Sequence, residues 1–358
     1  MGGRQPDRLS AQRIAGTALS VFPHQTAIYR DIVDSLAKRQ RFLEQGGARV
    51  PSSSSPSSSG DSSWTKYRVL LGKPGTDKSQ VIMRAMHTAI QQEQTVLLAA
   101  PVALLAQGYR EIFGEDLHCE TLHTVFNIPV NTCQKADVNF ALNRFDMLVV
   151  DESSLVSPES FQVVAATLNR LNCHPVVVIA GDKKQQQPLK TVEGKTSTTR
   201  SILNNDTFVA DDSVRHSLYE QFRVVDKDYA TFLDIIRYLQ PTQQQLEDFQ
   251  ENLVLCPSGV LADEEIFQAY SRTPDTIIMT VSWTAAQRVN GIVAEKLFAG
   301  QTPLCQVPRA SIADGAPILP YHGMRIVITE NRDKSSRVVN GQEAMLVSNH
   351  NNTQLIQY

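Results

Sequence analysis

The sequence predicts an α/β fold with a mainly parallel sheet. Short apolar strands alternate with helical patterns in the first half of the chain, as in sheets whose strands are joined by helices. A segment like a phosphate-binding loop, residues 72–79, follows one of these strands and opens a helix. Two later apolar runs end in the carboxylates Asp151-Glu152 and Asp182. Together these observations indicate a ligand site at the C-terminal edge of the sheet.

The composition limits the classes of protein to which the chain can belong. The 358 residues are 42% hydrophobic and 20% charged, which is enough for two or three globular domains. Because the net charge is -3, the positive charge that binds a nucleic acid would have to be concentrated in one part of the surface. The cysteines are scattered without a C-x-x-C pair, which favours a reducing compartment over a disulfide framework or zinc site. No apolar run is long enough to cross a bilayer, and no signal-peptide core is present, so we expect neither membrane insertion nor secretion.

The N-terminal part is expected to begin its ordered structure at Phe22, after disordered residues 1–21. An apolar stripe from Ile28 to Leu36 then predicts a helix. By itself, Gln25 in its first turn reads as a solvated residue. Residues 49–63 are Ser-rich and predict a flexible insert, because they cannot bury enough apolar surface to become ordered.

The segment from Gly72 to Ser79 matches the pattern G-x-x-x-x-G-K-[ST] at all fixed positions except one. The apolar strand 67–71 leads into it, and a helical pattern leads out. Backbone N–H groups and the helix N-terminus would face phosphates, Lys78 would reach the outer phosphates, and Ser79 would hold Mg²⁺. The residues expected to bind the nucleotide here are Gly72, Pro74, Gly75, Thr76, Asp77, Lys78, Ser79 and Gln80.

Asp77 is the exception, because the pattern has glycine there. Glycine adopts unusual backbone angles without strain and lets the backbone approach phosphate closely. A carboxylate about 4 Å from a phosphate would repel it by roughly 4 kcal/mol at an effective dielectric constant of about 20. Nucleotide binding would be weakened by orders of magnitude unless this carboxylate turns away.

The strand 145–150 ends at Asp151 and Glu152. Asp151 would bind Mg²⁺, and Glu152 would polarise the water that attacks the γ-phosphate. The plain alternative is a strand end with two solvated acids. Other expected strands are 95–101 and 175–182, and a helix with Leu104, Leu105 and Tyr109 follows the first of them. Residues 121–126 read, by themselves, as a loop with a packed histidine, and residues 193–212 as a polar loop.

The second half has strand and helix patterns but no second phosphate loop. The expected helices carry Phe232 to Leu239 and residues 285–298, the second closed by Gly300. The expected strands are 276–281, 324–329, 343–348 and 354–358, with an Asn340-Gly341 turn between the second and third.

The order of these segments resembles the superfamily 1 DNA helicases, specifically the RecD-like branch that includes the petite-integration-frequency helicases. The resemblance covers about Phe22 to Val347 and rests on a Gln-bearing segment, the phosphate loop, strand-Asp-Glu, Gly-Asp-x-x-Gln and Gln-Phe-Arg. It implies two RecA-like P-loop NTPase lobes, residues 22–210 and 211–358, with ATP and Mg²⁺ between them. It further implies that Gln25 reads adenine, that Gln185 senses the γ-phosphate, and that Arg223 reaches it from the second lobe.

The resemblance also implies function. A monomer would couple ATP hydrolysis to 5′-3′ translocation on single-stranded or forked DNA and to unwinding, in DNA repair, recombination or genome maintenance. Its location would be the nucleus or the mitochondrion. The residues implied to lie along the DNA are Pro101, Thr121 and His123 in the first lobe and Trp283, Thr284, Asn290, Asn340 and Gly341 in the second.

The chain departs from the family pattern in three places. Asp77 replaces the loop glycine, and Gln186 and Gln187 replace a leucine and a proline. The T-x-H-x-x-Q-G stretch and the final arginine motif are not found after Gly341, so we expect an incomplete second lobe. The alternatives are therefore a helicase, a catalytically impaired fragment or remnant that binds without turnover, and a ring-forming ATPase of AAA type.

Overall fold

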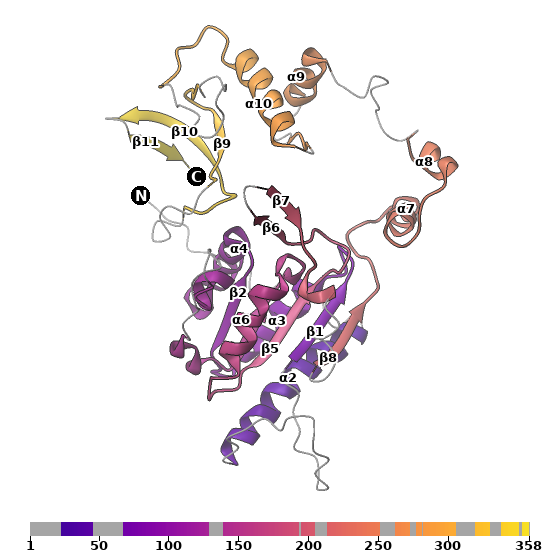
Figure 1. Ribbon diagram of the computed structural model, residues 1–358, viewed down its shortest axis with the longest axis vertical. Coiled ribbons are helices and arrows are strands. Elements are labelled where there is room, and N and C mark those ends of the chain that lie inside the picture. The colour runs from indigo at the N-terminus through magenta and orange to yellow at the C-terminus, as the bar shows by residue number, and fades with distance from the viewer. Residues whose placement is uncertain are drawn as a thin grey trace. The chain divides into compact units, whose positions relative to one another are not determined.

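The computed structural model describes residues 23–45, 67–128, 139–192, 195–204, 213–250, 262–272, 277–280, 282–305, 319–329, 338–350 and 353–357. The chain divides into two compact units, Met1–Arg237 and Tyr238–Tyr358, and each is described by itself (Figure 1). The expected disordered N-terminus, residues 1–21, and the expected Ser-rich insert, residues 49–63, lie outside the described residues.

The first unit alternates strands and helices. Its helices are α2 (Pro23–Glu44), α3 (Lys78–Gln91), α4 (Ala103–Phe113), α5 (Leu122–Val125), α6 (Pro158–Leu168) and α7 (Lys227–Tyr238), the last of which ends at the boundary between the units. Its strands are β1 (Tyr67–Gly72), β2 (Val96–Ala100), β3 (His118–Thr121), β4 (Met147–Val150), β5 (Val176–Gly181), β6 (Leu189–Val192), β7 (Lys195–Thr198) and β8 (Ser213–Leu218). Short 3-10 turns occur at Gly114–Asp116, Phe140–Arg144, Ser153–Leu155 and Ile202–Asn204.

Six of these strands form one parallel sheet in the order β3-β2-β4-β5-β1-β8. This confirms the predicted α/β class. Because all six strands run the same way, their C-terminal ends meet at one edge of the sheet. The phosphate loop follows β1, Asp151 follows β4, and Asp182 follows β5 at this edge.

Alternate residues of each central strand face opposite layers of the core, as the pleat requires. Leu98, Val149 and Val178 lie in the cluster that contains residues of α2, α3 and α4. Leu97, Val150 and Ile179 lie in the cluster that contains residues of α5 and α6. The sheet is therefore covered on both faces, which explains why its strands read as continuous apolar runs.

Ion pairs tie α2 to the sheet. The Asp31 carboxylate pairs with Arg68 of β1 at 2.7 Å, and its Oδ2 is within hydrogen-bond distance, 2.9 Å, of Nε2 of His216 in β8. Near the other end of the helix, Arg39 pairs with Asp146, just before β4, at 2.6 Å. These contacts fix the middle and the C-terminal part of α2 against the sheet.

The first unit extends further along the chain than predicted. The sequence placed its end at residue 210, but β8 pairs with β1 along its whole length, from Ser213 to Leu218. The segment 193–212, expected to be a loop, also contains β7, which pairs with β6 in an antiparallel hairpin. The strands β7 and β8 were missed because both are rich in polar residues.

The second unit contains α8 (Gln243–Gln250), α9 (Asp263–Ser271), α10 (Trp283–Leu297), β9 (Arg325–Val327), β10 (Glu343–His350) and β11 (Thr353–Gln357). Its described strands form an antiparallel sheet in the order β11-β10-β9, which differs from the parallel sheet expected for a second lobe. The Asn340-Gly341 turn is confirmed, with φ 92° at Gly341. Gly300, with φ 76°, follows α10 as expected. Residues 277–280, expected to be a strand, are irregular.

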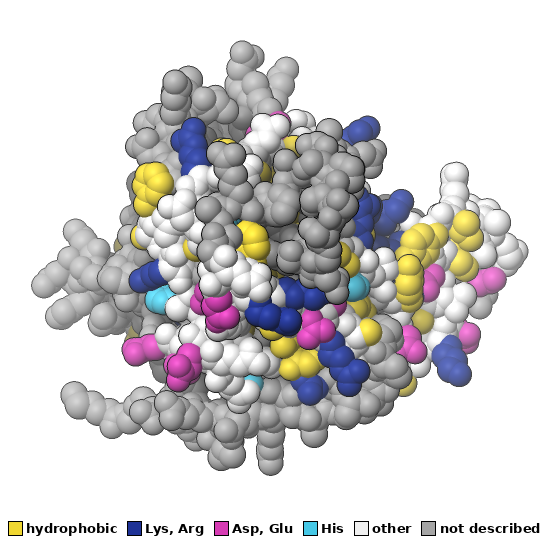
Figure 2. Space-filling model, turned by 90° about the horizontal axis from the view of Figure 1, so that it is seen from below, with side chains coloured by type: hydrophobic (Ala, Val, Ile, Leu, Met, Phe, Trp, Pro, Cys, Tyr) yellow, Lys and Arg dark blue, Asp and Glu magenta, His cyan; other side chains and the backbone are white. Residues whose placement is uncertain are grey.

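Charge is mixed on the face that Figure 2 shows, where Lys and Arg side chains alternate with Asp, Glu and hydrophobic ones. This agrees with the net charge of -3 and with the expectation that any basic site is local. In the described part of the chain, no helix combines the length and the apolar character that a membrane span requires.

Candidate nucleotide-binding site

The phosphate loop leaves the sheet at Gly72 and enters α3 at Lys78. The turn is tight: a Cβ atom on Gly72 would lie 2.6 Å from Thr76 Oγ1. Gly75 has φ 77°, and a Cβ atom there would lie 1.9 Å from Gln221 Oε1. Thr76 is fully buried, and its hydroxyl donates to the carbonyl of Lys73 at 2.9 Å. Both glycines are therefore required by the fold of the loop itself.

Asp77 has φ 58° and ψ 34°, the left-handed conformation, which explains why the pattern has glycine here. It is also the N-cap residue of α3, with no hydrogen bond from its side chain to the helix. Burial raises the pKa of its carboxyl, while Arg223 and Lys78 oppose that shift. The carboxylate thus lies close to two cations at the positive end of α3, where an anion is stabilised.

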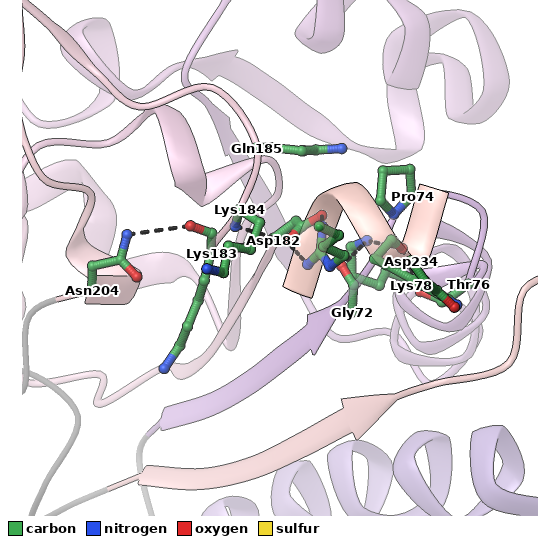
Figure 3. A network of polar contacts seen from close by, with 12 residues as sticks. Gly72, Pro74, Thr76, Lys78, Asp182, Lys183, Lys184, Gln185, Asn204 and Asp234 are labelled. Carbon is green, nitrogen blue, oxygen red and sulfur yellow. Dashed lines mark hydrogen bonds and ion pairs between the residues drawn. The ribbon is translucent and has the colours of Figure 1, made fainter. Parts of the chain in front are cut away.

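Lys78 is buried, and its ammonium folds back onto the loop (Figure 3). It donates to the carbonyls of Gly72 at 2.8 Å and Lys73 at 3.1 Å. Burial lowers the pKa of Lys78, and the carboxylates of Asp182, Glu152 and Asp151 act in the opposite direction. The cation is thus held by neutral carbonyls, which leaves it able to transfer its hydrogen bonds to an anion.

Ser79 and Asp151 meet beside this lysine. The Ser79 hydroxyl donates to Asp151 Oδ2 at 3.1 Å, and Asp151 is 2% exposed. A hydroxyl and a carboxylate are hard oxygen ligands of the kind that Mg²⁺ takes when substrate phosphates and water complete its shell. Among the residues that the structure describes, no group of three His, Cys, Asp or Glu side chains could hold a metal ion alone. The pair therefore fits a Mg²⁺ that arrives with a nucleotide.

Glu152 follows Asp151 with φ 50°, a left-handed conformation that turns it away from the strand direction. It is half-buried. Burial raises the pKa of its carboxyl, and repulsion by Asp151 raises it further, against Lys78 and Arg223. A carboxyl with a raised pKa is a better proton acceptor for an attacking water. The plain alternative of two solvated acids is wrong for Asp151, because that side chain is buried.

Gln25 is 2% exposed, so its interpretation as a solvated residue is wrong. Its amide Nε2 lies 3.4 Å from the carbonyl oxygen of Thr76, at a long hydrogen-bond distance. The first turn of α2 therefore borders the phosphate loop. The sequence could not show this, because 51 residues separate the two groups.

The segment Gln221-Phe222-Arg223 lies on the loop. Gln221 Nε2 donates to the carbonyl oxygen of Pro74 at 2.7 Å, and the N–H of Phe222 donates to the carbonyl oxygen of Gly75 at 2.8 Å. Gln221 Oε1 in turn accepts the N–H of Arg223 at 2.9 Å. This segment was expected to approach from a second lobe, but it belongs to the first unit. It follows β8, which pairs with β1, and so it emerges next to the loop.

Helix α7 adds two ion pairs that sequence reasoning missed. Asp234 pairs with Lys73 of the loop at 2.6 Å. Arg237, three residues later, makes two hydrogen bonds to the buried carboxylate of Asp182. Figure 3 shows Asp182, Asp234 and Lys78 gathered at the loop. The spacing of Asp234 and Arg237 puts both on one face of a helix, but nothing in the sequence identifies their partners.

Gln185 lies in the turn after β5, where its N–H donates to the carbonyl of Asp182 at 3.1 Å. Its side chain extends toward the side of Pro74 (Figure 3). Gln187, one of the departures from the family pattern, has a structural role. Its amide donates to the carbonyl of Gln185 at 2.8 Å and accepts from the N–H of Ser201 at 3.0 Å. This departure therefore braces the turn that carries Gln185.

The residues expected to contact DNA in the first unit follow two neighbouring strands. Pro101 comes after β2, and Thr121 ends β3 and caps α5 by accepting the N–H of Thr124. His123 is exposed on α5, so the interpretation as a packed histidine is wrong. The other expected contacts belong to the second unit: Trp283, Thr284 and Asn290 on α10, and Asn340 and Gly341 in the turn before β10.

Comparison with known proteins agrees with this geometry. Residues 62–223 match the family model described as AAA domain. No curated protein matches the sequence. Among solved structures, a Bacteroides Pif1 bound to single-stranded DNA has a TM-score of 0.57 at 17% identity, over 89% of this chain and 70% of that one. Pif1 helicases that coordinate at forked double-stranded DNA give a TM-score of 0.56 at 17% identity, over 90% and 72%. Residues 62–223 are therefore similar to the AAA domain family model, and the fold of the chain is similar to that of the Pif1 helicases in these two structures.

Proposed function

We propose that the chain is an ATP-dependent DNA helicase that couples ATP hydrolysis to 5′-3′ translocation on single-stranded DNA and to duplex unwinding. One observation carries the proposal. The loop lysine, the Ser79-Asp151 pair and the Gln221 segment converge at one edge of a rigid parallel sheet. They supply the cation, the oxygen ligands and the second cationic segment that phosphoryl transfer requires.

The chain's own residues perform distinct tasks in this proposal. The N–H groups at the start of α3 bind phosphate oxygens, and Lys78 moves its hydrogen bonds from the loop carbonyls to the outer phosphate. Ser79 and Asp151 hold Mg²⁺, which supplies positive charge against the charge that develops on the phosphate oxygens. Glu152 accepts a proton from the attacking water, and Arg223 stabilises the transferred group. In this proposal Gln25 reads the base and Gln185 senses the outer phosphate.

DNA is the proposed partner because the two structures with the same fold were solved with single-stranded DNA or describe unwinding at forks. Pro101, Thr121 and His123 would contact the strand on the first unit, and residues of α10 and the Asn340-Gly341 turn on the second. Backbone contacts and stacking dominate such binding, so we expect little preference for sequence.

The second candidate function is nucleotide or DNA binding without turnover. Asp77 favours it, because this residue is the N-cap of α3 and brings a negative charge near the helix N-terminus that a phosphate would use. Against it stand Arg223 and Lys78, which partly neutralise the carboxylate.

The test is ATP hydrolysis by the chain with and without single-stranded DNA, beside the Lys78→Ala variant. We expect DNA to stimulate hydrolysis and the variant to lose it by about 10²- to 10³-fold. Nucleotide binding without hydrolysis would support the second candidate. Unwinding of forks with a single 5′ or 3′ tail then decides the direction, and activity on the 3′ tail alone would contradict 5′-3′ movement.

A ring-forming ATPase is the remaining alternative, and the AAA domain match is compatible with it. Measurement of the molecular mass in solution, in the presence of nucleotide and DNA, distinguishes the helicase from the ring-forming ATPase. We expect a monomer, whereas a hexameric ring would favour this alternative.

A further inference from the structure

Tyr109 of α4 reaches the candidate metal pair from the core. Its ring is 5% exposed and belongs to the core cluster that also contains Met86 and Ala106. Its hydroxyl donates to Asp151 Oδ2 at 2.7 Å. In the sequence, Tyr109 is one apolar position of a helix stripe, and no local pattern indicates a partner for its hydroxyl.

The Asp151 carboxylate is fixed through both of its oxygens. Oδ2 accepts from Tyr109 and, at 3.1 Å, from Ser79, while Oδ1 accepts the N–H of Glu152 at 2.9 Å. Ser79 ends the phosphate loop and Glu152 directly follows Asp151, so both already have roles in the proposed site. Tyr109 belongs to α4, which is part of neither segment. The tyrosine is thus the contact that fixes the carboxylate from outside the phosphate loop and the β4 end.

Tyr109 donates this hydrogen bond as a neutral phenol. A phenol hydroxyl is a neutral hydrogen-bond donor at ordinary pH. A neutral donor orients a carboxylate without cancelling its charge, so Asp151 keeps the negative charge that a divalent cation needs.

We propose that Tyr109 is a positioning residue for Mg²⁺: its buried hydroxyl holds the Asp151 carboxylate in the orientation that, with Ser79, receives the metal ion. This inference rests on the proposed function, because it assigns the same site to Mg-nucleotide. Groups that hydrogen-bond a metal ligand contribute about 10- to 100-fold to metal affinity in other proteins. The opposite possibility is that the hydroxyl competes with the metal for Oδ2, in which case removing it would strengthen binding.

The test is a Tyr109→Phe variant, which keeps the ring in the core and removes only the hydroxyl. Its matched control is Tyr29→Phe, which removes a hydroxyl that hydrogen-bonds Thr88 at 2.9 Å, on the opposite half of α3 from Ser79. Two affinities are measured for each full-length protein: Mn²⁺ by electron paramagnetic resonance in the presence of ADP, and a fluorescent ADP analogue in EDTA. Thermal unfolding checks that both variants remain folded.

We expect Tyr109→Phe to bind Mn²⁺ about 10- to 100-fold more weakly, with unchanged metal-free ADP affinity and with Tyr29→Phe like the wild type. Unchanged or tighter Mn²⁺ binding by a folded Tyr109→Phe overturns the inference while leaving the proposed function intact. A wild-type chain that binds ADP but no Mn²⁺ overturns the inference, and one that binds neither overturns the proposed function as well.

Discussion

The two units of the chain differ in how their elements are buried. In the first, β2, β4 and β5 are buried at every position. In the described part of the second, β9 has no buried position, and the buried hydrophobic side chains are Ile266, Val339, Ala344 and Leu346. The first unit covers both faces of a parallel sheet with helices, whereas the described second unit has a three-stranded antiparallel sheet with few buried hydrophobic side chains. A rigid edge therefore exists in the first unit, and there the candidate chemistry gathers.

The same difference extends to ion pairs. The Arg237–Asp182 pair of the first unit has side-chain exposures of 15% and 0%, and the Arg288–Asp263 pair of the second has 48% and 60%. Buried pairs depend on both partners, because the remaining charge would be left without a counter-ion. Exposed pairs contribute little, since water solvates either charge.

The largest effect expected from this comparison is on stability. Arg237→Ala should lower the free energy of unfolding by about 3 kcal/mol, because the buried Asp182 would lose its ion-pair partner and keep only the N–H of Lys184 and the nearby charge of Lys78. The matched Arg288→Ala variant should lower it by no more than about 1 kcal/mol. Urea unfolding followed by fluorescence and circular dichroism measures both. Equal losses would contradict the idea that the first unit alone provides the rigid edge.

A smaller effect is expected on nucleotide affinity. Asp77→Gly removes a carboxylate, and also the Cβ atom of a residue with left-handed backbone angles, at the start of α3. Glu93→Gly is its matched control, because it removes a carboxylate and a Cβ atom from a residue with φ 61° just after the end of α3. We expect Asp77→Gly to bind ATP about tenfold more tightly, which is about 1.4 kcal/mol. The gain should be smaller than the full repulsion between the Asp77 carboxylate and a phosphate, because the positive charges of Arg223 and Lys78 offset part of it. Titration with a fluorescent ATP analogue checks this.

Glu93→Gly should bind the analogue like the wild type, because Glu93 is exposed and away from the loop. If both variants gain affinity equally, relief of backbone strain along α3 explains the gain, and the charge of Asp77 does not. If neither does, the carboxylate of Asp77 is fully accommodated.

The smallest effect concerns pH. The folded protein raises the pKa of Glu152 above its ordinary 4.5 and so binds that proton more tightly than the unfolded chain does. The free energy of unfolding contributed by Glu152 therefore falls as pH rises from about 4.5 through the raised pKa. Glu152→Gln should lack this fall. Unfolding at several pH values compares the two proteins.

Glu264 of the second unit gives the opposite control. Its hydrogen bond with Lys296 lowers the pKa of its carboxyl, so its contribution is present above the ordinary pKa and is lost as pH falls. Because water solvates this exposed pair, Glu264→Gln should show only a small pH-dependent difference, of the opposite sign. The same sign for both variants would contradict the assignment of Glu152 to a buried site.

The elements of the first unit that could be predicted are the ones with a strong local signal. The runs 67–71, 145–150 and 175–182 are mainly apolar because both faces of the sheet are covered, and each contains most or all of the strand expected there. The phosphate loop was recognisable because its backbone imposes residue types at fixed spacing. By contrast, β8 is polar, and its place beside β1 depends on pairing across more than 140 residues.

The residues of the candidate site also divide into those that carry a local signal in the sequence and those that do not. Lys78, Ser79 and Asp151 follow from spacing and from strand ends, and they come together as those patterns require. Tyr109, Asp234 and Arg237 carry no such signal, since a tyrosine in an apolar stripe and two charges on a helix are common features of any surface or core. Only the fold shows which partners they meet.

The measurement that tests the central claim most directly is the binding of a fluorescent ATP analogue, with Mg²⁺, to the wild-type chain and to Lys78→Ala. The claim is that the C-terminal edge of the first sheet binds Mg-nucleotide through the loop lysine. It predicts saturable binding by the wild type and an affinity about 10- to 100-fold weaker in the variant, as expected for a lost hydrogen bond to a charged group. Absence of binding by the folded wild type, or equal binding by both proteins, would contradict it.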